Sequence, residues 1–270
     1  MSKTTIAIAG LGWLGLPLAQ KLSTLGYSVK GSVTQLEKAA SLQQQGFNVF
    51  PVMLTETGVQ GSIAAFLKDV SILIIMIPPG LRGNTGSDYV LKMAHFLEAI
   101  EQQKVEKVIF VSSTSVYGDA QGMVTEKELP QPETEAGKQL LQVEQLFFNA
   151  PFLQSSIVRF GGLYGGARQP ARYLAGRTNL SNGDAPVNLI HREDCLGILT
   201  EIIKQNAFGH LFNAVSPEHP TKRNYYTAIA KGLGLEPPSY QTLNEELQFK
   251  QVDSVNLEVV LNYSFSKTLG

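Results

Sequence analysis

A short apolar run that leads directly into three spaced glycines constrains the fold of this sequence more than any other feature. Residues 6–9 form a continuous apolar run, as expected of a strand buried on both faces of a parallel sheet. Gly10, Gly12 and Gly15 follow with the spacing G-x-G-x-x-G, and an amphipathic pattern continues to Leu22. Such glycines permit a tight turn, close approach of backbone to a pyrophosphate, and close packing of helix on strand. The segment predicts a dinucleotide-binding turn; a purely structural glycine-rich turn is the alternative.

Composition limits what kind of protein this is. The chain has 270 residues, of which 43 % are apolar, enough for a sizeable core in one large or two small domains. Its net charge of -1 gives no overall field that would favour nucleic acid or an anionic membrane. No apolar run approaches the roughly 20 residues that span a bilayer, and the opening run lacks the basic leader of a signal peptide. We expect neither nucleic acid nor a membrane as a partner.

The single cysteine and the few histidines add two expectations. Cys195 cannot form an intramolecular disulfide, which fits a reducing, cytoplasmic compartment, and it is expected to pack as a small hydrophobe. The four histidines are too scattered along the chain to indicate a metal site.

The rest of the chain alternates between short apolar runs and amphipathic segments, which predicts repeated strand–helix units. Such units imply an α/β fold: a Rossmann-type, doubly wound, mainly parallel sheet of about seven strands with a small C-terminal substrate lobe. A mobile loop is expected at 82–87. We assign residues 1–165, with return elements at 187–215, to the dinucleotide-binding domain, and residues 166–186 and 216–270 to the lobe. Later strands are expected near 27–34, 48–52, 71–77, 107–111, 155–159 and 211–214, and later helices near 34–45, 63–68, 89–103, 137–148, 192–205 and 222–233.

The end of the second predicted strand bears on the choice of cofactor. Gly31-Ser-Val-Thr34 contains no acidic residue, whereas an NAD site usually places one there to bind the ribose 2′-OH. This leaves room for a 2′-phosphate, with Ser32, Thr34 and Lys38 as donors, so NADP is the expected cofactor and NAD the alternative. Thr34-Gln-Leu-Glu37 also has the pattern of a capping box, and both roles can hold together.

Several stretches in the second half of the chain resemble a known family. They are Val111-Ser-Ser-Thr-Ser-Val-Tyr-Gly118, Arg159-Phe-Gly-Gly-Leu-Tyr-Gly165, Asn188-Leu-Ile-His-Arg-Glu-Asp194, Leu211-Phe-Asn-Ala214 and Val252-Asp-Ser-Val-Asn256. With the N-terminal glycines, they resemble the extended short-chain dehydrogenases/reductases, in the NAD-dependent epimerase/dehydratase branch. More closely, the chain is similar to a compact bacterial subgroup of atypical members labelled nucleoside-diphosphate-sugar epimerases.

The resemblance implies a catalytic site with one departure. Ser113 corresponds to the hydroxyl that holds the substrate oxygen, and Thr114 and Ser115 would face the substrate. The family's Tyr-x-x-x-Lys pair aligns with Thr134 and Lys138, so the lysine that binds the nicotinamide ribose is kept and the tyrosine is replaced. An aliphatic hydroxyl does not ionise at neutral pH without a metal or base beside it, so Thr134 is a poor substitute. Proton transfer would then fall to one of several candidates: Tyr117, Glu133, Glu135 or a water held by Ser113.

The remaining site assignments follow from the glycine motif and the resemblance together. A basic stretch with Arg168, Arg172 and Arg177 is expected to bind an anionic group of the substrate, or to be a solvated surface run. The residues expected to bind the cofactor are Gly10, Gly12, Trp13, Leu14, Gly15, Ser32, Thr34, Pro78, Pro79, Ser112, Lys138, Phe160, Gly161 and Leu163.

Two functions remain open at this point. The first is an NAD(P)-dependent epimerase/dehydratase or reductase that acts on a small alcohol or carbonyl compound, sugar-derived in the family. The second is an NAD(P)-binding sensor or scaffold without turnover, which the missing tyrosine favours. The resemblance also carries the expectation of a homodimer.

Overall fold

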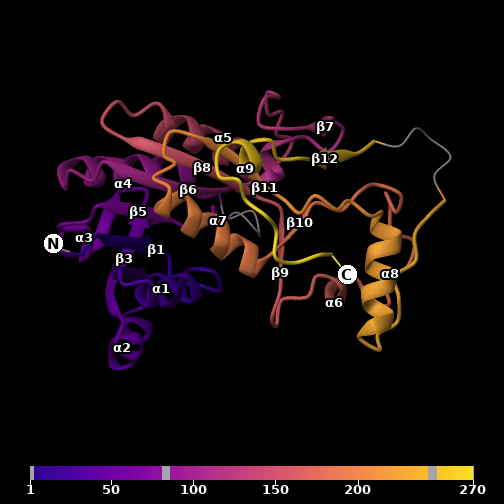
Figure 1. Cartoon of the computed structure of the whole chain (residues 1–270), viewed down its shortest axis with the longest axis horizontal. Helices are drawn as coiled ribbons and strands as arrows, with labels where there is room; N and C mark the ends of the chain where they lie inside the picture. The colour runs from indigo at the N-terminus through magenta and orange to yellow at the C-terminus, as the bar shows by residue number, and fades with distance from the viewer. Residues whose placement is uncertain (1–2, 81–85, 243–247, 270) are drawn as a thin grey trace.

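The computed structural model describes residues 3–80, 86–242 and 248–269, so most of the predicted loop at 82–87 lies outside the described residues. An eight-stranded sheet forms its centre (Figure 1). Seven strands are parallel, as predicted, and β4, at one edge, pairs antiparallel with β3. In spatial order the strands are β11 (Leu211–Ala214), β8 (Gln154–Phe160), β6 (Lys107–Ser113), β5 (Ile72–Ile75), β1 (Thr5–Ala9), β2 (Ser28–Val33), β3 (Asn48–Thr55) and β4 (Gly58–Gly61).

Helices cover both faces of the sheet, because its central strands are apolar on both sides. Ile6 and Ile8 of β1 pack into one core, with α1 (Gly15–Thr24), α2 (Leu36–Gln44) and α7 (Arg192–Lys204). Ala7 and Ala9 of the same strand pack into the opposite core, with α3 (Ile63–Leu67), α4 (Tyr89–Gln102) and α5 (Glu135–Phe148). The described part of the chain contains no helix with the length and hydrophobicity of a transmembrane span.

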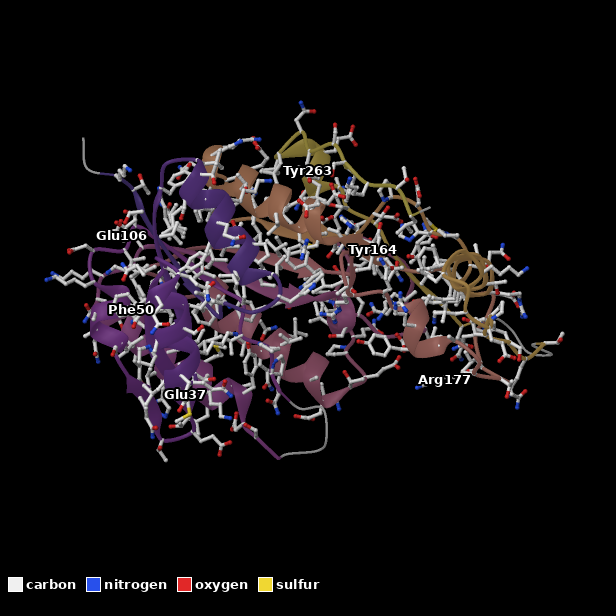
Figure 2. All side chains as sticks on the ribbon, turned by 90° about the horizontal axis from the view of Figure 1, so that it is seen from below. Glu37, Phe50, Glu106, Tyr164, Arg177 and Tyr263 are labelled. Atoms are coloured by element: carbon white, nitrogen blue, oxygen red, sulfur yellow. The ribbon has the colours of Figure 1, made fainter. Side chains whose placement is uncertain are left out.

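A small lobe extends from the carboxyl ends of the strands. The parallel pair of β9 (Gly162–Tyr164) and β10 (Leu189–His191) leads into it from the dinucleotide-binding domain, and within it α6 (Ala171–Leu174) packs against α8 (Lys222–Gly232) (Figure 1). Tyr164 lies where the lobe meets the sheet domain, and Arg177 lies on the lobe itself (Figure 2). A third, small hydrophobic core holds the lobe together; its buried members are Tyr164, Val187, Leu189, Tyr225 and Leu269.

The C-terminal segment does not complete the lobe as expected. β12 (Lys250–Val252) pairs with β7 (Gly122–Val124), and α9 (Asn256–Val259) packs beside β11. Leu257 and Leu261 belong to the core beside α1 and α7, and the hydroxyl of Tyr263 lies 3.0 Å from a carboxylate oxygen of Asp194. The assignment of all of 216–270 to the lobe is therefore corrected: from β12 to Tyr263 the chain packs on the sheet domain.

Candidate functional site

The glycine turn between β1 and α1 has the geometry of a phosphate-binding loop. Gly10 has φ +106°, a conformation that favours glycine, and a Cβ on Gly15 would lie 2.2 Å from the carbonyl oxygen of Gly10. A Cβ on Gly12 would meet no atom within 4 Å, so the middle of the loop is open. Leu14 caps α1 without a side-chain hydrogen bond, and the first turn contains no acidic residue. The positive end of this helix is thus available to an anion, and the loop fits a dinucleotide.

The carboxyl end of β2 lies directly beside this loop. The buried hydroxyl of Ser32 accepts a hydrogen bond from the Gly10 amide at 3.3 Å, so it stabilises the loop from inside. Thr34 is exposed, and the ammonium of Lys38 donates to the carbonyl of Leu11 at 3.0 Å. Of the three donors predicted for a 2′-phosphate, Thr34 and Lys38 therefore remain available at the surface of the site.

The predicted capping box at the start of α2 is wrong. The helix begins at Leu36, and its N-cap is Gln35, which makes no side-chain capping hydrogen bond. Thr34 lies one residue too early to cap the first turn, which leaves its hydroxyl free of that role.

The end of β5 forms the next side of the site. Met76 follows this strand, and its carbonyl oxygen would lie 3.1 Å from a Cβ on Gly10. The hydroxyl of buried Tyr89 donates to the carbonyl of Ile77 at 2.7 Å and holds the start of the Pro78–Pro79 turn. The two prolines thus follow a strand end that touches the glycine loop.

The turn after β6 brings the predicted catalytic positions to the start of α5. Ser113 is half-buried, and its Oγ accepts from the Ser115 amide at 3.2 Å at the start of the short helix η1 (Thr114–Val116). A Cβ on Gly137 would lie 2.4 Å from the Ser115 carbonyl oxygen, so α5 packs directly on this turn. Lys138 is exposed on the first turn of α5, next to Thr134.

Thr134 has a structural task at the position of the family's tyrosine. It is the N-cap of α5, and its Oγ1 accepts from the Gly137 amide at 3.1 Å. The flanking carboxylates have partners too: Glu133 accepts from the Asp119 amide at 3.1 Å, and Glu135 accepts from the Gln139 side chain at 2.8 Å. Neither contact reaches Ser113, so both are local to the helix start and the adjoining loop.

The capping role of Thr134 predicts a measurable loss of stability. We expect Thr134→Ala to lower the free energy of unfolding by about 1 kcal/mol, because the Gly137 amide loses its acceptor. Thr134→Ser, which keeps the hydroxyl, should unfold like the wild type in urea. Equal stability of the alanine variant and the wild type would contradict the assignment of Thr134 as a cap.

Three residues predicted for the site lie in the interior instead. The hydroxyl of Ser112 donates to Glu144 at 2.6 Å, and Phe160 packs in the core beneath the sheet. Tyr117 is 1 % exposed, and its hydroxyl, bound by Arg159 at 2.7 Å, is fully engaged. Burial raises the pKa of Tyr117, despite the opposing effect of Arg159. Ser112 and Phe160 thus lie in the core, and the hydroxyl of Tyr117 is bound within the protein.

The other predicted positions are also placed. Thr114 is buried, whereas Ser115 and Leu163 are half-buried. Gly161 packs tightly against the backbone of Asn188, because a Cβ there would lie 2.8 Å from its carbonyl oxygen.

Lys250 of β12 contacts the turn that follows Ser113, and Lys222 interacts electrostatically with it. The ammonium of Lys250 donates to the carbonyls of Tyr117 at 2.7 Å and Thr114 at 3.3 Å, and lies 3.0 Å from Asp119. Burial lowers the pKa of Lys222, Lys250 lowers it further, and Asp119 opposes the shift. No sequence pattern indicated this cluster, because its members, Asp119, Lys222 and Lys250, come from three distant segments.

The predicted basic stretch divides between two places. Arg172 and Arg177 are exposed on the lobe. Arg168 lies against the glycine loop, with its guanidinium carbon 5.3 Å from the ring centre of Trp13. Arg192, which the sequence did not single out, lies over the same ring at 5.4 Å.

Comparisons with known proteins agree with this geometry. Residues 10–205 match the family described as NAD(P)H-binding. Protein YeeZ of Escherichia coli strain K12 is 33 % identical over 261 residues, which cover 96 % of this chain and 95 % of that protein. The uncharacterised UDP-glucose epimerase YtcB of Bacillus subtilis strain 168 is 27 % identical over 131 residues, which cover 43 % of this chain and 40 % of that protein.

Solved structures share the whole fold. UDP-glucuronic acid 4-epimerase from Bacillus cereus in complex with NAD superposes with a TM-score of 0.80 at 20 % identity, covering 98 % of this chain and 93 % of that one. UDP-N-acetylglucosamine 4-epimerase from Bacillus cereus superposes with a TM-score of 0.79 at 19 % identity, covering 99 % of this chain and 96 % of that one. The family match begins at Gly10, the first glycine of the loop, and continues through α7. The chain thus belongs to the NAD(P)H-binding family and has the fold of the epimerase/dehydratase branch of the short-chain dehydrogenases/reductases.

Proposed function

We propose that this protein is an NADP-dependent oxidoreductase or epimerase that acts on a small alcohol or carbonyl compound. The observation that carries the proposal is the contact between the Ser113 turn and the start of α5, beside an open glycine loop. Ser113 would donate a hydrogen bond to the substrate oxygen, and Lys138 would bind the ribose hydroxyls of the cofactor. The bound nicotinamide would supply or accept the hydride.

The choice of NADP rests on the end of β2. The described surface there offers the hydroxyl of Thr34 and the ammonium of Lys38, which already lies against the glycine loop. Both are donors, and a 2′-phosphate needs donors, whereas the ribose 2′-OH of NAD is usually held by a carboxylate.

An anionic substrate is supported by the lysine cluster rather than by the arginines of the lobe surface. The ammonium of Lys250 lies against the turn that follows Ser113, and Lys222 is close enough to interact electrostatically with both Lys250 and Asp119. Ammonium groups are donors that suit a phosphate or carboxylate, so an anionic group on the substrate would be favoured there.

A second function, cofactor binding without turnover, is favoured by one observation. Thr134 uses its hydroxyl to cap α5, so the position of the family's acid/base residue performs a structural role. A protein of this kind would bind NADP and report on it, with no need of a proton donor.

A titration followed by a turnover assay separates the two functions. We expect the wild type to bind NADPH more tightly than NADH and to change nicotinamide absorbance with at least one alcohol or carbonyl substrate from a panel of anionic compounds. Ser113→Ala should then reduce kcat about 100-fold or more with an unchanged Kd for NADPH, since it removes a donor to the reacting oxygen. Tight NADPH binding with no turnover across the panel would favour the sensor, and binding of no nicotinamide nucleotide would refute both functions.

A further inference from the structure

Two arginines from distant segments gather on the one tryptophan of the glycine loop. Arg168 comes from the connection between β9 and α6, and Arg192 is the first residue of α7. Their guanidinium carbons lie 5.3 and 5.4 Å from the ring centre of Trp13. Each contact is a cation–π interaction, worth about 0.5–2 kcal/mol according to how far it is desolvated. The indole therefore fixes both cations beside the loop.

The charges of this pair are not balanced within the described residues. Among those residues Arg192 makes one salt bridge, to Glu193, with 3.6 Å between Nη2 and Oε1, and Arg168 makes none. The Nε of Arg192 is buried and has no acceptor in the described part of the chain. A buried donor without an acceptor costs about 1–3 kcal/mol, and more when it is charged. The Nε of Arg192 is thus a buried, charged donor that an anionic ligand beside Trp13 would satisfy.

The location makes these cations costly unless an anion binds. Arg192 stands at the positive end of α7, where a helix disfavours cations, so helix stability does not account for it. The positive end of α1 also lies at Trp13, and its first turn carries no acidic residue. The first turn of α7 carries Glu193 and Asp194, which offset its own positive end, so the end of α1 and the two guanidiniums are the positive groups that act at the glycine loop.

We propose that Arg168 and Arg192 form a clamp on the pyrophosphate of the dinucleotide, with Trp13 as the platform that holds both guanidiniums. The inference rests on the proposed cofactor site. Forks of guanidinium donors match the oxygens of a phosphate, and the glycine loop supplies backbone donors on its own side. The clamp also ties the lobe connection and α7 to the cofactor, so cofactor binding orders the segment that borders the substrate.

The test measures affinity for three ligands by isothermal titration: NADPH, 2′-phospho-ADP-ribose and adenosine 2′-monophosphate. The first two contain the pyrophosphate and the third does not. Arg192→Met keeps the apolar stem and removes the charge. It should weaken both pyrophosphate ligands by roughly tenfold or more and leave adenosine 2′-monophosphate unchanged. Arg168→Met should behave in the same way.

Arg223→Met is the matched control, because Arg223 lies over the ring of Tyr240 at 5.4 Å in the lobe. Arg223→Met removes a cation–π contact of the same length, remote from the glycine loop, and should change none of the three affinities. Unchanged NADPH affinity in both folded test variants would overturn the clamp, as would equal losses for all three ligands. If the wild type binds no nicotinamide nucleotide, the proposed function fails first and the clamp with it.

Discussion

Replacing Glu144 with leucine should lower the free energy of unfolding by about 3–5 kcal/mol, the range seen when one partner of a buried ion pair is removed. Glu144 and Arg159 are each 3 % exposed, and two nitrogens of the guanidinium contact the carboxylate, with 2.6 Å between Nη2 and Oε2. Ser112 also donates to this carboxylate, and Tyr117 accepts from Arg159. Glu144→Leu therefore leaves two nitrogens of a buried guanidinium, Nε and Nη2, and the buried hydroxyl of Ser112 without their acceptor.

Urea unfolding followed by circular dichroism measures the effect. The double variant Glu144→Leu/Arg159→Met should recover most of the loss, because it removes both charges and leaves apolar side chains in their place. Lys204→Met is the surface control: it breaks an exposed pair with Glu201 at 3.0 Å and should cost less than about 1 kcal/mol. A single variant within 1 kcal/mol of the wild type would show that the network contributes little to stability.

The sequence predicted the parallel sheet and the glycine turn because their signals are local. A continuous apolar run predicts a strand, a glycine spacing predicts a turn and a helical period predicts a helix, and each pattern lies within about 20 residues. The edge strand β4 was not predicted, because Gly58–Gly61 is short and contains two glycines, which carry no strand preference.

The site was predicted less well, because burial of polar groups depends on distant partners. Ser112 and Tyr117 stand in the same motif as the half-buried Ser113, and nothing in the motif shows which of these hydroxyls are buried. The hydroxyl of Ser112 binds Glu144, 32 residues away in the sequence, and the hydroxyl of Tyr117 binds Asn213, 96 residues away. Arg192 was missed for the same reason, because the ring that it contacts belongs to Trp13, near the opposite end of the matched residues 10–205.

Placing valine at Gly12 should abolish cofactor binding without unfolding the protein. A Cβ at this position meets no atom within 4 Å, so the side chain would enter open space at the centre of the glycine loop. That space is where the backbone must approach the pyrophosphate, and the added methyl groups would occupy it. We expect the Kd for NADPH to rise at least about 100-fold, equivalent to about 3 kcal/mol, with a Tm close to that of the wild type.

Gly15→Val supplies the contrast within the same motif. Its Cβ would lie 2.2 Å from the carbonyl oxygen of Gly10, an atom of the backbone that cannot move without separating α1 from β1. This variant should lose stability first, with a clearly lower Tm, and lose NADPH binding as a consequence. Thermal shift without ligand, paired with NADPH titration, separates the two effects. If Gly12→Val binds NADPH like the wild type, the open centre of the loop is not where the pyrophosphate lies, and the proposed cofactor site must move.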